Sequence, residues 1–335
     1  MLKLTKPLPK THLWVRMRRV FHYGDGPWQG LIIFISALVI VLMLAIGGLL
    51  WTRSAGARSA FGWSFLAPTA SPNWDPVNDQ FQAWPFLYGT LETSLFAILF
   101  ALPIGIGIAI FLAELCPTWL RTPLTWLVEL LAAIPSVVYG LWGIFVFLPK
   151  VVAPVGVFLG DTLGKIPVLG SLFAGPIPAS GSSRLAASLI LTIMIIPTIA
   201  AVSRDVFLAI PNSQREAAKA LGATEWETIW QVLIPFGRSG FLGAVILGLG
   251  RALGETMAVT MVIGNSIQGG TSLLLPGYSM ASIIANEFAE SVSQIHTDAL
   301  IEIGLVLFII TLLLSILARF LVWQVARQAP QEARS

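Results

Sequence analysis

Six long apolar runs alternate with polar stretches along the chain. They cover residues 31–51, 86–112, 124–148, 185–202, 241–263 and 299–323. The first run holds 21 residues without a charge. A helix of that length rises about 1.5 Å per residue and crosses the roughly 30 Å hydrocarbon layer of a bilayer. The pattern predicts an all-α membrane protein with six transmembrane helices.

The polar stretches between the runs predict loops. Segments 52–85 and 149–183 are rich in Ser, Pro and Gly and have no sustained period. Within the second, Gly160, Gly164 and Lys165 faintly resemble a phosphate-binding loop. Such a loop needs four residues between the glycines and Ser or Thr after the lysine, whereas this chain has three and then an isoleucine. We therefore reject a nucleotide site here.

A charged, amphipathic segment at 213–235, called the knob below, lies between the fourth and fifth runs. Ser213 with Glu216 has the spacing of a capping box, and so does Thr224 with the glutamate three residues later. Gly222 between them suits the left-handed conformation that ends a helix. The knob is predicted to be a helix, a glycine turn and a second helix.

The second helix of the knob is expected to continue until Pro235 ends or kinks it. Ala217, Ala218 and Ala220 make one face of the knob thin enough to enter a groove on another protein. An ordinary helical loop is the alternative interpretation of the same spacing.

The composition also places the chain in a membrane. Of its 335 residues, 56% are hydrophobic and 11% are charged, with a mean hydropathy of +0.82, whereas soluble domains carry about 25% charged residues. The single Cys116 excludes an intrachain disulfide, and His12, His22 and His296 are too scattered for a metal site. We expect no cofactor, and the net charge of +3 does not favour nucleic acid.

Lys and Arg are distributed unevenly between alternate segments. With the N-terminus inside, the inside segments hold 14 of them and the outside segments five, which agrees with the positive-inside rule. This predicts cytoplasmic termini and a cytoplasmic knob. The expected organisation is a basic tail at 1–30, a first helix at 31–51, a core at 86–323 that contains the loop 204–240, and a tail at 324–335.

Arg251 and Glu255 are charges inside the fifth run. Arg251 lies ten residues from its start, about 15 Å along a helix, where a charge costs at least about 2.5 to 3.5 kcal/mol. A spacing of four puts both on one helical face, where they can pair. Such a pair could fix helix packing. Alternatively, both line a substrate pathway, in which Arg251 offers donors to an oxyanion while Glu255 holds the guanidinium.

Four other acids lie near the expected ends of spans: Glu92, Glu114, Glu129 and Glu302. Side chains in such positions can reach the membrane interface. We expect each to be solvated or to cap a helix, and not to lie in a pathway.

The knob resembles the EAA loop of ABC importer permeases, whose pattern is EAA, three residues, Gly, nine residues, Ile, one residue and Leu-Pro. The residues that match are Glu216, Ala217, Ala218, Gly222 and Pro235. Val232 stands for the Ile and Ile234 for the Leu, so both positions stay aliphatic. The resemblance implies that the first four matching residues couple this chain to a separate ATPase subunit and that this chain has no catalytic residue.

Two further segments, AIPSVVYGLWG at 133–143 and GRALGETMA at 250–258, resemble the permeases of phosphate-specific ABC importers, the PstC type more than the PstA type. The similarity covers most of the chain from Tyr88 onward. It implies a type I ABC importer permease in a bacterial inner membrane, which forms half of a phosphate pathway through Arg251 and Glu255. The implied partners are a PstA-like second permease, two PstB-like ATPase subunits and a PstS-like periplasmic phosphate-binding protein.

Three other functions stay open from the sequence. The chain could be a permease for another oxyanion, such as sulfate or molybdate. It could be a signalling scaffold whose knob recruits a regulator without moving solute. A membrane enzyme with Glu255 as its base is disfavoured, because no nucleophile, metal cluster or second acid accompanies that carboxylate.

Overall fold

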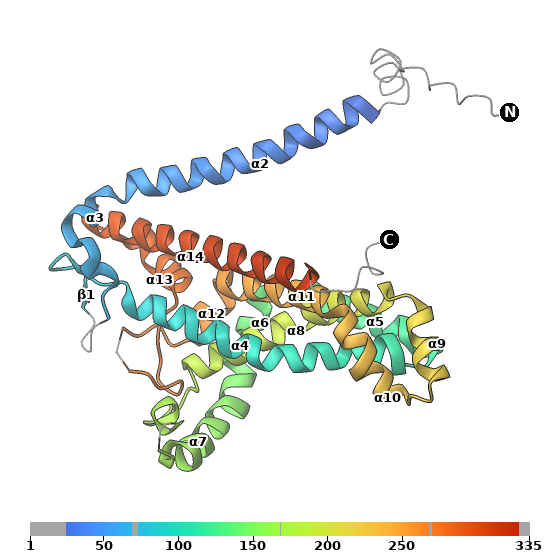
Figure 1. Ribbon diagram of the computed structural model, residues 1–335. Coiled ribbons are helices and arrows are strands. Elements are labelled where there is room, and N and C mark those ends of the chain that lie inside the picture. The colour runs from blue at the N-terminus through green and yellow to red at the C-terminus, as the bar shows by residue number, and fades with distance from the viewer. Residues whose placement is uncertain (1–24, 69–72, 168, 268–269, 328–335) are drawn as a thin grey trace, which may run out of the picture. The chain divides into compact units, whose positions relative to one another are not determined.

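The computed structural model describes residues 25–68, 73–167, 169–267 and 270–327 (Figure 1). The chain forms two units, residues 1–52 and 53–335. Helix α2 (Asp25–Arg53) makes up the described part of the first unit and contains a candidate membrane span, Trp28–Arg53. The predicted tail at 1–30 lies mostly outside the described residues, and the tail at 324–335 does so in part.

The second unit is built almost entirely from helices. In chain order they are α3 (Ala55–Phe61), η1 (Gly62–Leu66), α4 (Trp84–Ile110), η2 (Phe111–Leu115), α5 (Thr118–Ala133), α6 (Ser136–Trp142), η3 (Gly143–Val152), α7 (Ala153–Thr162), η4 (Leu163–Lys165), η5 (Leu169–Phe173), α8 (Arg184–Ala209), α9 (Asn212–Ala220), α10 (Glu225–Thr228), η6 (Ile229–Leu233), α11 (Ile234–Gly254), α12 (Met257–Val262), α13 (Met280–Glu287), η7 (Phe288–Glu290) and α14 (Gln294–Arg327).

Helix α8 is the centre of this unit. Of its most apolar window, 67% is buried, more than in any other candidate span of the described residues. It packs along α4 and against α5 and α11, and among the described helices it contributes the largest share of buried side chains to the main apolar core. Many large apolar side chains of the other spans are exposed, which suits contact with lipid or another subunit.

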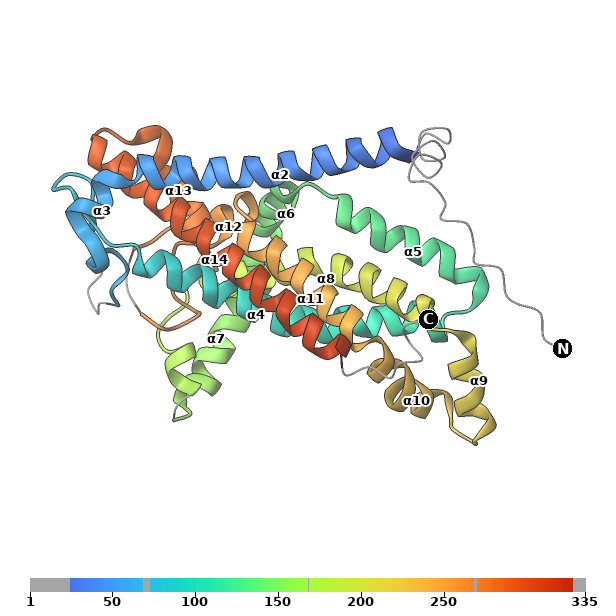
Figure 2. The same cartoon turned by 45° about the horizontal axis from the view of Figure 1, so that its top comes forward.

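A short antiparallel hairpin closes one end of the second unit. Its strands are β1 (Trp74–Asp75) and β2 (Gln80–Phe81). Trp74 is buried against the ring of Phe86, and its Nε1 donates to Glu287 Oε2 at 2.7 Å. Asn78 Nδ2 donates to Asp75 Oδ2 at 2.6 Å, and this hydrogen bond lowers the pKa of Asp75. Figures 1 and 2 show α9 and α10 at the opposite end of the unit.

The prediction of six membrane helices is confirmed among the described residues, where six helices are long and apolar enough to cross a bilayer. They cover Trp28–Arg53, Trp84–Leu115, Ser136–Lys165, Arg184–Ala209, Glu225–Gly254 and Gln294–Gln324. The direction in which the chain crosses the membrane stays a prediction.

The predicted third span, 124–148, is wrong in its limits. Helix α5 ends at Ala133, because Pro135 restricts the residue before it to extended backbone and Ile134 has ψ 128°. The apolar span starts at Ser136 and continues through Pro149, which lies inside the π-helical segment η3. Much of the expected loop at 149–183 is therefore helical, in the last part of η3 and in α7, η4 and η5.

Candidate functional site

The predicted pair of charges lies at a break between two helices. Helix α11 ends at Gly254, and Glu255 takes an extended conformation with φ −73° and ψ 124°. Its Oε1 accepts a hydrogen bond from the backbone N–H of Ala258 at 3.2 Å and so caps the start of α12. The expected single span at 241–263 and the Arg251–Glu255 pair on one helical face are therefore wrong. A spacing of four brings side chains together only while the helix continues.

Arg251 is half-buried in the last turn of α11 and has weak partners. Its Nη1 donates to Thr198 Oγ1 at 3.3 Å and its Nη2 to Ala132 O at 3.5 Å. Both distances are long for hydrogen bonds, and a guanidinium has five donors. Among the described residues, no carboxylate lies within ion-pairing distance of Arg251. Its charge is therefore available to an anion.

The two segments that carried the phosphate-permease resemblance meet beside Arg251. Helices α6 and α12 pack against each other, and Gly140 makes this possible because a Cβ there would lie 2.5 Å from Met261 Sδ and 3.4 Å from Ala258 Cα. Tyr139 Oη donates to Leu131 O at 2.9 Å and ties α6 to the end of α5. Three helix ends therefore meet near one guanidinium.

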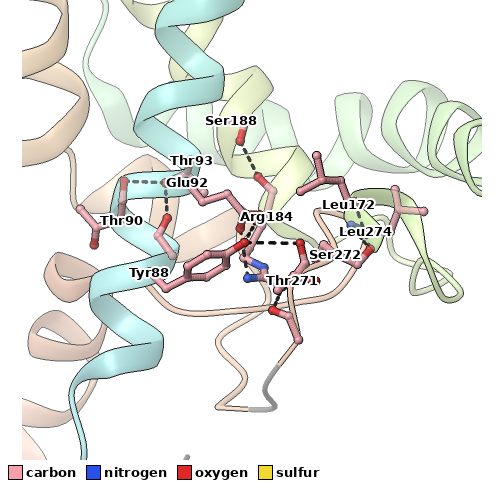
Figure 3. A network of polar contacts seen from close by, with 12 residues as sticks. Tyr88, Thr90, Glu92, Thr93, Leu172, Arg184, Ser188, Thr271, Ser272 and Leu274 are labelled. Atoms are coloured by element: carbon pink, nitrogen blue, oxygen red, sulfur yellow. Dashed lines mark hydrogen bonds and ion pairs between the residues drawn. The ribbon is translucent and has the colours of Figure 1, made fainter. Parts of the chain in front are cut away.

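Arg184 is buried and, unlike Arg251, has strong polar partners (Figure 3). Its Nη1 lies 3.0 Å from Glu92 Oε2, and the two side chains are 5% and 4% exposed. Its Nη2 donates to Gly270 O at 2.6 Å and to Ser272 O at 2.7 Å, and its guanidinium lies 5.3 Å from the ring centre of Tyr88. Arg184 therefore holds the 270–275 loop against α4 and α8, and its charge is neutralised.

The expectation for the four remaining acids is confirmed for one of them. Glu129 is 52% exposed at its side chain. Glu92 is instead the buried partner of Arg184, Glu302 is 6% exposed with Oε2 unpaired, and Glu114 pairs with Arg215 at 2.6 Å. Glu92 and Glu302 lie about two helical turns inside their helices, so the predicted span limits placed them too close to the interface.

The glycine turn of the knob is confirmed. Gly222 has φ +89°, and its N–H donates to Lys219 O while that of Ala223 donates to Ala218 O, which is the Schellman motif. The capping box of Thr224 with its glutamate, Glu227, is also confirmed. The α9 and α10 helices on either side of this turn form the far end of the unit (Figure 2).

Two other details of the knob are wrong. The capping box at Ser213 is absent, since α9 begins at Asn212 behind Pro211, whose φ of −57° and ψ of 137° set the helix start earlier. Pro235 does not end the second helix, because the π-helical segment Ile229–Leu233 precedes it and the chain continues directly into α11; the alternative, a kink at Pro235, stays a prediction. Pro235 there occupies the first turn of α11, where a missing N–H is tolerated.

The predicted coupling residues occupy one exposed region. Glu216, Ala217 and Gly222 are exposed and Ala218 is buried. Sequence reasoning missed the apolar part of this surface, which consists of Leu221, 90% exposed, and the ring pair Trp226 and Trp230 with centroids 5.6 Å apart. The spacing of four between these tryptophans on a predicted helix could have indicated this apolar surface. No feature of the sequence indicates that Thr198 lies beside Arg251.

Comparison with known proteins gives consistent matches. Residues 105–328 match the family described as binding-protein-dependent transport system inner membrane component. The chain is 42% identical over 294 residues to the phosphate transport system permease protein PstC of Xylella fastidiosa, a match that covers 88% of this chain and 89% of the relative. It is 47% identical to the protein of the same description from Haemophilus influenzae, over 87% and 89% of the two chains.

Two solved transporters share the fold at low identity. A bacterial ABC transporter involved in the import of alginate aligns with a TM-score of 0.55 and 15% identity over 93% of this chain and 98% of its own. The MetNI methionine ABC transporter in an inward-facing conformation aligns with a TM-score of 0.53 and 19% identity over 76% and 99%. These likenesses concern the fold alone.

Proposed function

Because the chain belongs to the family of binding-protein-dependent transport system inner membrane components, we propose that it is the permease subunit of an ATP-driven phosphate importer. It is a multi-pass membrane protein with the type I ABC importer permease fold that the sequence predicted. The relatives are transport permease components. ATP hydrolysis then belongs to a separate partner chain.

The observation that carries the substrate proposal is the environment of Arg251. A guanidinium with two long neutral hydrogen bonds and no carboxylate partner keeps donors for a tetrahedral oxyanion. Arg184 does not fit this role, because Glu92 and two carbonyls already occupy it. In this proposal Arg251 contacts the passing ion, and Glu255 caps α12 so that α11 ends beside the pathway.

The knob is proposed to dock into the ATPase. Glu216 and Ala217 are exposed on α9, Gly222 turns the chain, and Leu221 and Trp226 add apolar contact area. Exposed large apolar side chains beside charged ones are typical of protein-binding surfaces. Ala218 is buried where α9 packs against η6 and α10, and its proposed role is to keep α9 in place within the knob.

The proposed assembly follows the family. It contains a PstA-like second permease, two PstB-like ATPase subunits and a PstS-like phosphate-binding protein, in a bacterial inner membrane with both termini and the knob in the cytoplasm. Closure of the ATPase pair would move the knob, and the pathway beside Arg251 would open alternately to the two sides.

Uptake of labelled phosphate into proteoliposomes that contain the assembled complex tests this function. We expect uptake that requires ATP on the knob side and loaded binding protein on the other, with competition by arsenate and little by sulfate. Because a guanidinium binds several tetrahedral oxyanions, preferential competition by sulfate or molybdate would reassign the substrate. The absence of any solute movement would favour a signalling scaffold.

A further inference from the structure

Arg215 in α9 joins three parts of the chain through one guanidinium. Its Nη2 lies 2.6 Å from Glu114 Oε1, and its Nε donates to Glu114 Oε2 at 3.1 Å. Nη2 also donates to Phe207 O at 2.7 Å, and Nη1 donates to Ile210 O at 2.7 Å. The last donor of Nη1 reaches Asn212 Oδ1 at 3.4 Å. All five donors of the guanidinium therefore have an acceptor.

The acceptors belong to the ends of two long helices. Glu114 lies in η2, the π-helical end of α4. Phe207 and Ile210 are at the end of α8, where the last carbonyls lack the usual helical donor four residues later. Phe207 O accepts from the N–H of Ile210 at 3.2 Å and from Arg215. The side chains of Arg215 and Glu114 are 16% and 11% exposed, so water screens this pair less than a typical surface ion pair.

An apolar cluster connects the same helix ends to the other half of the knob. Its buried members are Ala109, Ile110, Ala113, Phe207, Ile210, Ile229, Leu233 and Phe241. They come from α4 with η2, from α8, and from η6 with α11. A displacement of the knob must therefore either move the ends of α4 and α8 or break these contacts, because packed interfaces do not deform continuously.

Further contacts connect the ends of α4 and α8 to Arg251. Helices α4 and α8 pack along their length in both views of the fold (Figures 1 and 2). Thr198 on α8 accepts a hydrogen bond from Arg251 at 3.3 Å. A shift of α8 thus changes the position of an atom that contacts the proposed phosphate-binding guanidinium.

We infer that the Arg215–Glu114 pair is the link that transmits movement of the knob to α4 and α8, and through them to Arg251. Arg215 is a positioning residue, because its side chain is fully occupied and does not reach the pathway. The inference rests on the proposed function and adds to it the residues through which a movement of the knob reaches the rest of this chain.

The test measures phosphate uptake and ATP hydrolysis in the same proteoliposomes for Glu114→Gln and Arg215→Lys. Glu114→Gln keeps the shape of the side chain and removes its charge. Arg215→Lys keeps the charge, but an ammonium has three donors and no fork. We expect assembly and hydrolysis within about twofold of wild type and a loss of about tenfold in phosphate moved per ATP, as for a coupling of about 1.4 kcal/mol.

Glu129→Gln is the matched control, because it removes a long 3.5 Å ion pair between α5 and α8 whose carboxylate is 52% exposed, and it should stay within about twofold. Unchanged phosphate per ATP in Glu114→Gln and Arg215→Lys overturns the inference. So does failure of both variants to assemble, which would make the pair a folding element. A wild-type complex without ATP-dependent uptake defeats the proposed function as well, so the two failures are distinguishable.

Discussion

At the scale of single residues, the buried Arg184 and the half-buried Arg251 differ in their partners. Arg184 is held by a carboxylate and two carbonyls, whereas among the described residues Arg251 has only a hydroxyl and a distant carbonyl. A buried charge that is paired within the protein holds the paired segments together. A charge inside a membrane span that has no acidic partner is suited to binding a ligand of opposite charge. The two arginines should therefore respond differently to substitution.

Replacing Arg251 by Gln should reduce phosphate uptake by about tenfold to hundredfold, the loss of a charged hydrogen bond worth about 1.5 to 3 kcal/mol. Assembly should be unchanged, because the hydrogen bonds that Arg251 makes are long. The control is Arg204→Gln, since Arg204 is neutralised by two exposed acids, Asp205 and Glu129. It should lose less than twofold. Full uptake by the Arg251 variant would contradict a role in phosphate binding and favour a role in helix packing.

Replacing Glu92 by Gln should destabilise the protein by about 3 to 5 kcal/mol, because the Arg184 charge would stay buried without its partner. Thermal unfolding in detergent measures this. Glu129→Gln should cost less than about 1 kcal/mol, since the Glu129 side chain is 52% exposed and lies 3.5 Å from Arg204. The double change Glu92→Gln with Arg184→Met should be milder than Glu92→Gln alone. Equal melting temperatures for the Glu92 and Glu129 variants would contradict this account.

At the scale of elements, the sequence predicted turns and helix starts that depend on neighbouring residues. It did not predict contacts between residues far apart in the chain. Gly222 and Thr224 set a turn and a helix start through their own backbone, so the sequence predicted both. The start of α9 was misplaced because Pro211 acts before Ser213. The Arg215–Glu114 contact joins residues 101 positions apart, and no spacing in a single sequence encodes such a pair.

Gly222 offers a prediction about the knob. Its φ of +89° costs a residue with a Cβ about 1 to 2 kcal/mol, while its Cβ position is free of neighbours within 4 Å. Gly222→Ala should lower phosphate uptake per ATP a few-fold, Gly222→Pro should lower it most, and Gly222→Asn should lower it least. Gly243→Ala, equally free of neighbours, is the control. Normal coupling in Gly222→Pro would show that this turn does not matter.

At the scale of the whole molecule, hydropathy predicted the class of protein but not the limits of its helices. Proline explains the largest error, because Pro135 ended a helix while Pro149 lay inside a π-helical segment. The family predicted from the segments 133–143 and 250–258 is confirmed by the comparisons. These segments contribute residues to α6 and to α12, two helices that pack together. The predicted Arg251–Glu255 pair is wrong, because α11 ends at Gly254 and the Glu255 carboxylate accepts from the N–H of Ala258 instead.

The central claim is that this chain conducts phosphate and is moved by a partner's ATP hydrolysis. ATP hydrolysis by the reconstituted complex, measured with empty and with phosphate-loaded binding protein, tests it most directly. The account predicts hydrolysis that rises several-fold with the loaded protein and none from this subunit alone. Nucleotide turnover by the isolated subunit, or hydrolysis that is indifferent to phosphate, would contradict it.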